Sequence, residues 1–97
     1  MKLRFTARAA RDLTEIADYI RAESPHAAER VRASIIESLR VLSEFPKAGR
    51  RQSVKGVRKL VTRKYGYLVY YSLRERTEEV VILTIQHPAR QRDFSDR

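Results

Sequence analysis

The chain has 97 residues, no cysteine and a formal net charge of +9, with 42% hydrophobic and 34% charged residues. This composition suits one globular domain over residues 1–97 and excludes disulfides and thiolate chemistry. No apolar run approaches the roughly 20 residues that span a bilayer, and the N-terminus lacks the apolar core of a secretion signal. The sequence therefore predicts a cytoplasmic protein with no membrane partner.

The first half of the chain predicts a strand and two helices. Polar and apolar residues alternate over residues 2–6, as in a half-buried strand. Thr6 suits the N-cap of a helix that runs to about Glu23. Ser24, which precedes a proline, suits the N-cap of a second helix that runs to about Glu44. Each helix has one apolar face, formed by Ala10, Leu13, Ile16, Ala17 and Ile20 in the first and by Ala28, Val31, Ile35, Leu39 and Leu42 in the second.

The second half predicts a basic loop and three strands. The loop follows the Phe45-Pro46 pair, and the strand-like segments span residues 57–63, 67–73 and 79–86. The last segment is apolar on both faces, so it should lie centrally in the sheet. The predicted fold is α+β with the order β-α-α-β-β-β. An N-terminal helical hairpin packs on a mostly antiparallel sheet whose first strand lies at an edge.

Positive charge is concentrated in the middle of the sequence. Residues 47–76 contain ten Lys or Arg against one acidic residue, Glu75. Residues 1–46 contain eight against seven, and residues 77–97 contain three against four. Basic surfaces attract nucleic acids and acidic proteins. A solvated surface is the plain alternative, but so uneven a distribution favours an acidic partner.

Three segments, in this order, resemble the ParE/RelE toxins: "FPKAGRR" (residues 45–51), "VRKLVTRKYGYLVYYS" (residues 57–72) and "VVILTIQHPARQRDF" (residues 80–94). The resemblance extends over nearly the whole chain and implies the RelE/ParE-like fold. It also implies the toxin role in a type II toxin–antitoxin system. In such systems a small antitoxin wraps the toxin in a hetero-oligomer, here a ParD-like protein or one similar to it.

The resemblance leaves two branches open. ParE-like members bind and inhibit DNA gyrase, whereas RelE-like members are ribosome-dependent endoribonucleases that cut messenger RNA. RelE-like nucleases usually carry an arginine in the second hairpin strand, where this chain has Tyr67. They also tend to offer a tyrosine or a second cation near the C-terminus, where this chain has Phe94. These departures favour the ParE-like branch, with no catalytic residues and no cofactor.

A nuclease remains the alternative, because metal-free RNA cleavage needs only an acid/base group and cations around the phosphate. The residues that would serve it are His87, Arg63, Arg58 and Arg90. In the plain interpretation His87 only bonds to a backbone carbonyl and closes the sheet. A second alternative is a non-toxic nucleic-acid-binding module, although no helix is basic on one face as a groove reader would be.

Two binding surfaces are predicted for the favoured function. The target-binding residues are Arg58, Arg63, Lys64, His87, Arg90 and Arg92. The antitoxin-binding residues are Tyr67, Tyr71, Arg50, Arg51 and Lys59, although strand tyrosines more often pack in cores. No metal site is expected, because two histidines without suitably placed carboxylates or thiols do not form a cage.

Overall fold

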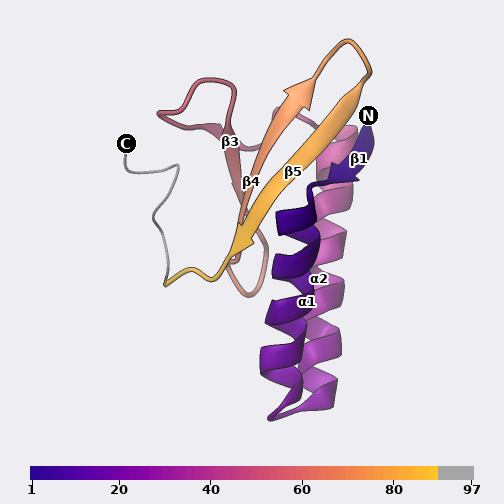
Figure 1. Ribbon diagram of the computed structural model, residues 1–97, viewed down its shortest axis with the longest axis vertical. Helices are drawn as coiled ribbons and strands as arrows, with labels where there is room; N and C mark the ends of the chain where they lie inside the picture. Colours follow the sequence, from indigo (N-terminus) through magenta and orange to yellow (C-terminus); the bar gives the residue numbers. More distant parts are fainter. Residues whose placement is uncertain (90–97) are drawn as a thin grey trace.

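Two antiparallel helices lie side by side against one face of a sheet in the computed structural model, which describes residues 1–89 (Figure 1). The helices are α1 (Ala7–Arg21) and α2 (Pro25–Glu44), and their connecting turn projects beyond the sheet. The Thr6 hydroxyl accepts a hydrogen bond from the Ala9 N–H, and the Ser24 hydroxyl accepts one from the Ala27 N–H. Both predicted N-caps are therefore confirmed. No helix within residues 1–89 has the length and apolar character needed to cross a membrane.

The sheet has five strands in the order β1-β5-β4-β3-β2. The strands are β1 (Lys2–Phe5), β2 (Arg50–Arg51), β3 (Arg58–Val61), β4 (Leu68–Arg74) and β5 (Glu79–Gln86). β1 runs parallel to β5 at the edge, and the other pairs are antiparallel. The predicted α+β fold and the edge position of β1 are confirmed. The two-residue strand β2 lies in the segment predicted as a loop, because so short a strand leaves no periodic pattern.

β5 is an interior strand, as its apolar character predicted, but the middle of the sheet is β4. One face of β5 packs on the helices through Val80, Ile82 and Ile85. On the other face, Leu83 packs in a second cluster with Tyr70 and its neighbours. β5 is therefore buried on both faces without being the central strand.

The main core lies between the helices and the sheet. All five apolar positions predicted for α2 are buried. On α1 Ala17 is buried as predicted, but Ala9 is buried where Ala10 was predicted, and Ala10 is exposed. Ala9 and Ala10 lie four and three positions before Leu13, so helical spacing allows either of them to share its face. The direction in which α1 meets the sheet selects Ala9.

Candidate functional site

The outer edge of β5 is completed by α1 where β1 ends. The last β1 residue, Phe5, lies opposite Ile82. The Thr6 N–H then donates to the Ile82 carbonyl (3.1 Å), and the Thr6 hydroxyl donates to the Leu83 carbonyl (2.9 Å). The start of α1 thus supplies hydrogen bonds that a longer β1 would otherwise make.

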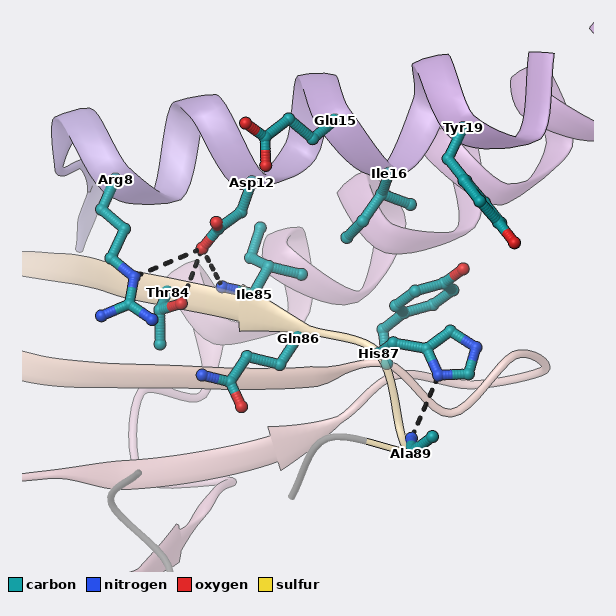
Figure 2. A pocket seen from close by; sticks show the side chains of 11 residues that line it. Arg8, Asp12, Glu15, Ile16, Tyr19, Thr84, Ile85, Gln86, His87 and Ala89 are labelled. Atoms are coloured by element: carbon teal, nitrogen blue, oxygen red, sulfur yellow. Dashed lines mark hydrogen bonds and ion pairs between the residues drawn. The ribbon is translucent and has the colours of Figure 1, made fainter. Parts of the chain in front are cut away.

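Asp12 continues this edge nearly two helical turns further along α1. Its Oδ2 atom accepts a hydrogen bond from the Thr84 hydroxyl (2.6 Å) and one from the Ile85 N–H (3.0 Å). The Arg8 guanidinium lies 4.0 Å from the same oxygen (Figure 2). Because the Thr84 side chain is buried, the carboxylate satisfies polar groups that water cannot easily reach.

A β-bulge lies at the same place. Tyr70 pairs with Thr84, but the next residue, Tyr71, pairs with Ile82, which leaves one extra residue on β5. The bulge shifts the alternation of β5, so that Ile85 follows Ile82 into the main core. The bulge therefore sets the direction of the residues that follow, which end in His87.

A cleft of about 770 Å³ opens between α1 and the end of β5 (Figure 2). Its walls combine apolar, aromatic and charged side chains. They are formed by Arg8, Asp12, Glu15, Ile16, Tyr19, Tyr67, Thr84, Ile85, Gln86, His87 and Ala89. With two carboxylates beside one arginine, the cleft is not a cationic surface.

His87 lies at one end of this cleft, against Tyr67. The two ring centroids are 5.6 Å apart and the planes are nearly perpendicular. The exposed imidazole accepts a hydrogen bond at Nδ1 from the Ala89 N–H (3.0 Å), which leaves the proton of the neutral ring on Nε2. His87 does bond to the backbone, but as an acceptor from an N–H and not as a donor to a carbonyl. Burial raises the pKa of the Tyr67 hydroxyl above its ordinary value of 10.0.

Arg58 and Tyr71 lie on the helix-facing side of the sheet at the other end of β3 and hold the loop that follows α2. The Arg58 guanidinium donates to the carbonyls of Lys47 (3.3 Å) and Gly49 (2.8 Å). The Tyr71 hydroxyl donates to the Pro46 carbonyl (2.7 Å) and accepts from the Gly49 N–H (2.8 Å). Tyr71 has no exposed surface, so in this structure its side chain belongs to the core.

Arg63 and Lys64 lie at the opposite end of β3, in the tight turn that leads to β4. Both side chains are exposed, and Lys64 has a left-handed backbone with φ of 76°. Five residues of extended chain separate Arg63 from Arg58, which is roughly 16 Å. The structure thus brings Arg63 and Lys64 towards the end of β4 that holds Tyr67, and separates both from Arg58. Arg90 and Arg92 lie outside the described residues.

The predicted antitoxin-binding residues are divided between the two faces of the sheet. Arg50 pairs with Lys59, which pairs with Tyr70, so these side chains share the face opposite the helices. Arg51 pairs with Arg58 on the helix-facing side. Tyr67 and Tyr71 also face the helices, but both are buried in the main core. Tyr67 and Tyr71 thus share one face of the sheet and Tyr70 lies on the other, as the alternation of side chains along a strand requires.

The cations of residues 47–76 are not neutralised by the rest of the described chain. Within residues 1–89, the carboxylates that form ion pairs do so with Arg4, Arg8, Arg21 and Arg40. None of the ten Lys and Arg of residues 47–76 takes part in these pairs. Over the same described range, no cluster of three His, Cys, Asp or Glu is placed to hold a metal ion.

Asp12 and Thr84 were not predicted as site residues. The signal for Asp12 was available in the sequence, because it lies four positions before Ile16 and flanks the apolar face of α1. An acidic residue on that side of a helix needs a partner from the sheet. Thr84 gave no comparable signal, since threonine is common in strands.

Known proteins of similar sequence and shape are toxins or toxin–antitoxin complexes. The family model described as the ParE toxin of the type II toxin-antitoxin system parDE matches residues 3–92. A Sinorhizobium fredii protein named "Putative toxin Y4kP" is 38% identical over 90 residues, which cover 93% of this chain and 91% of that protein. Solved structures also share the fold, and two of them are compared with this chain below.

The chromosomal ParDE toxin–antitoxin system from P. aeruginosa superposes with a TM-score of 0.76 at 30% identity, over 90% of this chain and 95% of that one. The intact E. coli RelBE toxin–antitoxin complex superposes with a TM-score of 0.67 at 19% identity, over 89% and 94% of the two chains. At the lower identity, the second likeness extends to the fold alone.

Proposed function

This chain belongs to the ParE toxin family of type II toxin–antitoxin systems, and from that membership we propose that it acts by binding and inhibiting DNA gyrase. We further propose that a cognate antitoxin, ParD-like or similar, neutralises it in a hetero-oligomer. The first half of the proposal concerns the target, and the second concerns the regulator. Each has its own support and its own test.

The residue at position 67 is the main support for a binding mechanism over a nuclease mechanism. RelE-like nucleases usually place an arginine there, and this chain has a buried phenol ring that packs edge-on against His87. The other residues that a nuclease would use do not converge on that ring. Arg58 lies on β3 opposite Tyr71, which is four residues beyond Tyr67, and its guanidinium is bound to two loop carbonyls. A scissile phosphate beside His87 would be out of its reach.

The exposed cations of the turn after β3 are the proposed target contacts. Arg63 and Lys64 lie at the end of the sheet that also holds His87, and the chain continues from there to Arg90 and Arg92. Charged groups at the rim of an interface steer association and make it sensitive to salt. We therefore assign Arg63, Lys64, His87, Arg90 and Arg92 to the target, and Arg58 mainly to holding the loop.

The antitoxin is proposed from two observations. The P. aeruginosa neighbour comes from a ParDE system and the E. coli neighbour from a RelBE complex. The basic residues 47–76 of this chain make no ion pair within residues 1–89. An acidic antitoxin would neutralise this charge at Arg50, Arg51 and Lys59 and would stabilise the toxin by mass action.

A supercoiling assay with purified gyrase tests the target. The protein should inhibit supercoiling, and Arg63→Glu with Lys64→Glu should weaken the inhibition by about tenfold or more. The matched control is Arg30→Glu with Arg32→Glu on α2, which makes the same change in net charge at exposed positions. Full supercoiling at any toxin concentration would refute the gyrase proposal.

The RelE-like alternative can be tested at His87, because its imidazole is exposed and could act as the acid/base group. Primer extension on translated messenger RNA reports cleavage directly, and His87→Ala removes the best acid/base candidate. We expect no cleavage by the wild type. Ribosome-dependent cleavage that disappears in His87→Ala, with folding and antitoxin binding intact, would replace gyrase inhibition by the nuclease function.

A further inference from the structure

A second cleft, of about 510 Å³, lies where the loop after α2 meets the β2–β3 loop. Four cations line it: Lys47, Arg51, Lys55 and Arg58. All four lie within residues 47–58, and the pairing of β2 with β3 brings the two ends of this segment together. Arg51 at the edge of the sheet lies directly opposite Arg58 on β3.

The positions of these cations are fixed by the backbone around them. Arg58 is anchored by the carbonyls of Lys47 and Gly49. The β2–β3 loop is closed by hydrogen bonds from Gln52 to Val57 and from Val57 to Val54. Gly56 has a φ of 80°, a conformation that glycine adopts without strain, and it follows Lys55 in the loop. The cleft is therefore part of the folded structure and does not depend on flexible side chains alone.

The charge of this cleft is out of balance. Glu75 is its one carboxylate, and it forms no ion pair with the four cations within the described part of the chain. Grouping like charges opposes folding unless a ligand of opposite sign offsets the repulsion. The unpaired cations therefore indicate a negatively charged ligand.

The other walls of the cleft distinguish between two kinds of negatively charged ligand. Val57 and Leu73 give it an apolar part, and the Glu75 carboxylate is only a hydrogen-bond acceptor. A nucleic-acid backbone offers phosphate oxygens, which Glu75 would repel and which make no favourable contact with the apolar wall. A polypeptide offers acidic side chains for the cations, apolar side chains for Leu73, and backbone N–H groups that Glu75 accepts.

We infer that this cleft is a docking site for an acidic, partly apolar peptide segment of a partner protein. The adjacent strand favours an extended segment. β2 is the last strand of the sheet and pairs only with β3 among residues 1–89, so its outer edge can hydrogen-bond an added strand. The inference rests on the proposed function in one respect, namely that the antitoxin is the natural source of the segment.

Fluorescence anisotropy with the full chain tests this site. The probe is a short fluorescein-labelled peptide that alternates glutamate and valine, at low salt. The wild type should bind it, and Arg51→Glu with Lys55→Glu should weaken binding by about tenfold or more. Both residues are exposed, so the variant should fold. The control Arg30→Glu with Arg32→Glu should weaken binding by less than about threefold, since its charges lie outside the cleft.

Three results would overturn the inference. One is the absence of peptide binding by the wild type, and another is an equal loss in both double variants, which would indicate non-specific attraction. The third is displacement of the peptide by a thymidine oligonucleotide of equal charge whose own binding is weakened in the cleft variant. That result would identify the cleft as a nucleic-acid site. Arg51→Gln with Lys55→Gln serves if the glutamate variant fails to fold.

Growth arrest on induction separates this inference from the proposed function. Arrest by the wild type with no peptide binding would refute the cleft and leave the toxin function. Peptide binding that depends on Arg51 and Lys55, with gyrase unaffected, would support the cleft and refute the proposed target.

Discussion

Among single residues, Asp12 supplies the hydrogen-bond acceptor that a neighbouring β-strand would otherwise offer to β5. Its carboxylate receives two donors from the bulged part of β5, one from the backbone and one from a buried hydroxyl. A β-bulge leaves backbone groups out of the regular ladder, and an interior N–H without an acceptor is costly. Asp12 therefore stabilises the strand end that leads to His87.

Replacing Asp12 by alanine should lower the free energy of unfolding by about 1–3 kcal/mol, because the Ile85 N–H and the Thr84 hydroxyl lose their acceptor. Urea denaturation measures the loss. Asp18→Ala on the same helix is the control. Its carboxylate is 62% exposed and, among residues 1–89, pairs only with Arg21, so the substitution should cost under about 0.5 kcal/mol. Similar losses in both variants would contradict the role given to Asp12.

Tyr71 is the second residue whose environment has a measurable consequence. Burial raises the pKa of its hydroxyl above 10.0, while the hydrogen bond from Gly49 and the charge of Arg58 oppose this rise. The folded state therefore disfavours the tyrosinate more than the unfolded chain does. The associated stability is present below pH 10 and is lost as the pH rises through the higher pKa of the folded protein. The same sign holds for Tyr67.

Stability measured by urea denaturation should therefore fall steeply above pH 10. Tyr67→Phe should make that fall shallower, because the variant has no hydroxyl to ionise in either state. Tyr19→Phe is the matched control, since Tyr19 is 83% exposed and the same atom is removed. An alkaline slope that is unchanged in Tyr67→Phe would contradict the role of burial.

Gly49 has a packing role in the same region. A β-carbon there would lie 2.7 Å from the Tyr71 ring and 2.8 Å from the Lys59 carbonyl. Such contacts are too close for either atom, and a backbone carbonyl cannot move aside as a flexible side chain would. The closeness of Gly49 to Tyr71 is what allows the loop after α2 to cross the end of the sheet and reach β2.

Among the helices and strands, the two N-cap residues differ in the elements that their side chains connect. Ser24 caps α2 and makes no other side-chain contact of note within the helical hairpin. Thr6 caps α1 through the Ala9 N–H and at the same time donates to the Leu83 carbonyl of β5. Thr6 therefore links a helix start to the sheet, whereas Ser24 stabilises a helix start alone.

Ser24→Ala should cost about 1 kcal/mol of stability, as the loss of an N-cap does. Thr6→Ala should cost about 2 kcal/mol, because a bond to the strand is lost as well. Thermal or urea unfolding of the two variants compares them directly. Equal costs would mean that the Thr6–Leu83 bond contributes nothing to the junction of α1 and β5.

At the scale of the whole molecule, the charge is divided between two regions. Ion pairs neutralise arginines of residues 1–46, which are also nearly balanced in composition. The ten cations of residues 47–76 have no such partners within residues 1–89. They occupy both ends of β3 and both faces of the sheet, so they form several basic areas and not one continuous face.

The free protein should therefore become more stable when salt is raised from low to physiological concentration. At physiological ionic strength, counterions screen the repulsion between exposed charges that lie more than about 8 Å apart. The melting temperature should rise by about a few degrees. Arg51→Glu with Lys55→Glu should reduce this salt dependence, because the variant relieves repulsion in the cleft. A melting temperature that falls with added salt would contradict the proposed self-repulsion.

The local features of this protein follow from its sequence. Thr6 and Ser24 are capping residues whatever the tertiary structure, and the spacing from Ala28 to Leu42 gives α2 one apolar face. Alternation along β4 assigned Tyr67 and Tyr71 to one face and Tyr70 to the other. These features depend on residues within a few positions of each other, where backbone geometry fixes the neighbours.

The contacts between distant residues follow from the packing of the whole chain. Asp12 and Ile85 are 73 positions apart, and Tyr71 and Pro46 are 25 apart, so no local periodicity predicts either bond. The strand register also divided the basic residues, pairing Arg51 with Arg58 and Arg50 with Lys59. Composition gave the amount of charge, but its grouping depends on sheet order and packing, since a shift of one residue moves a strand's side chains to the other face.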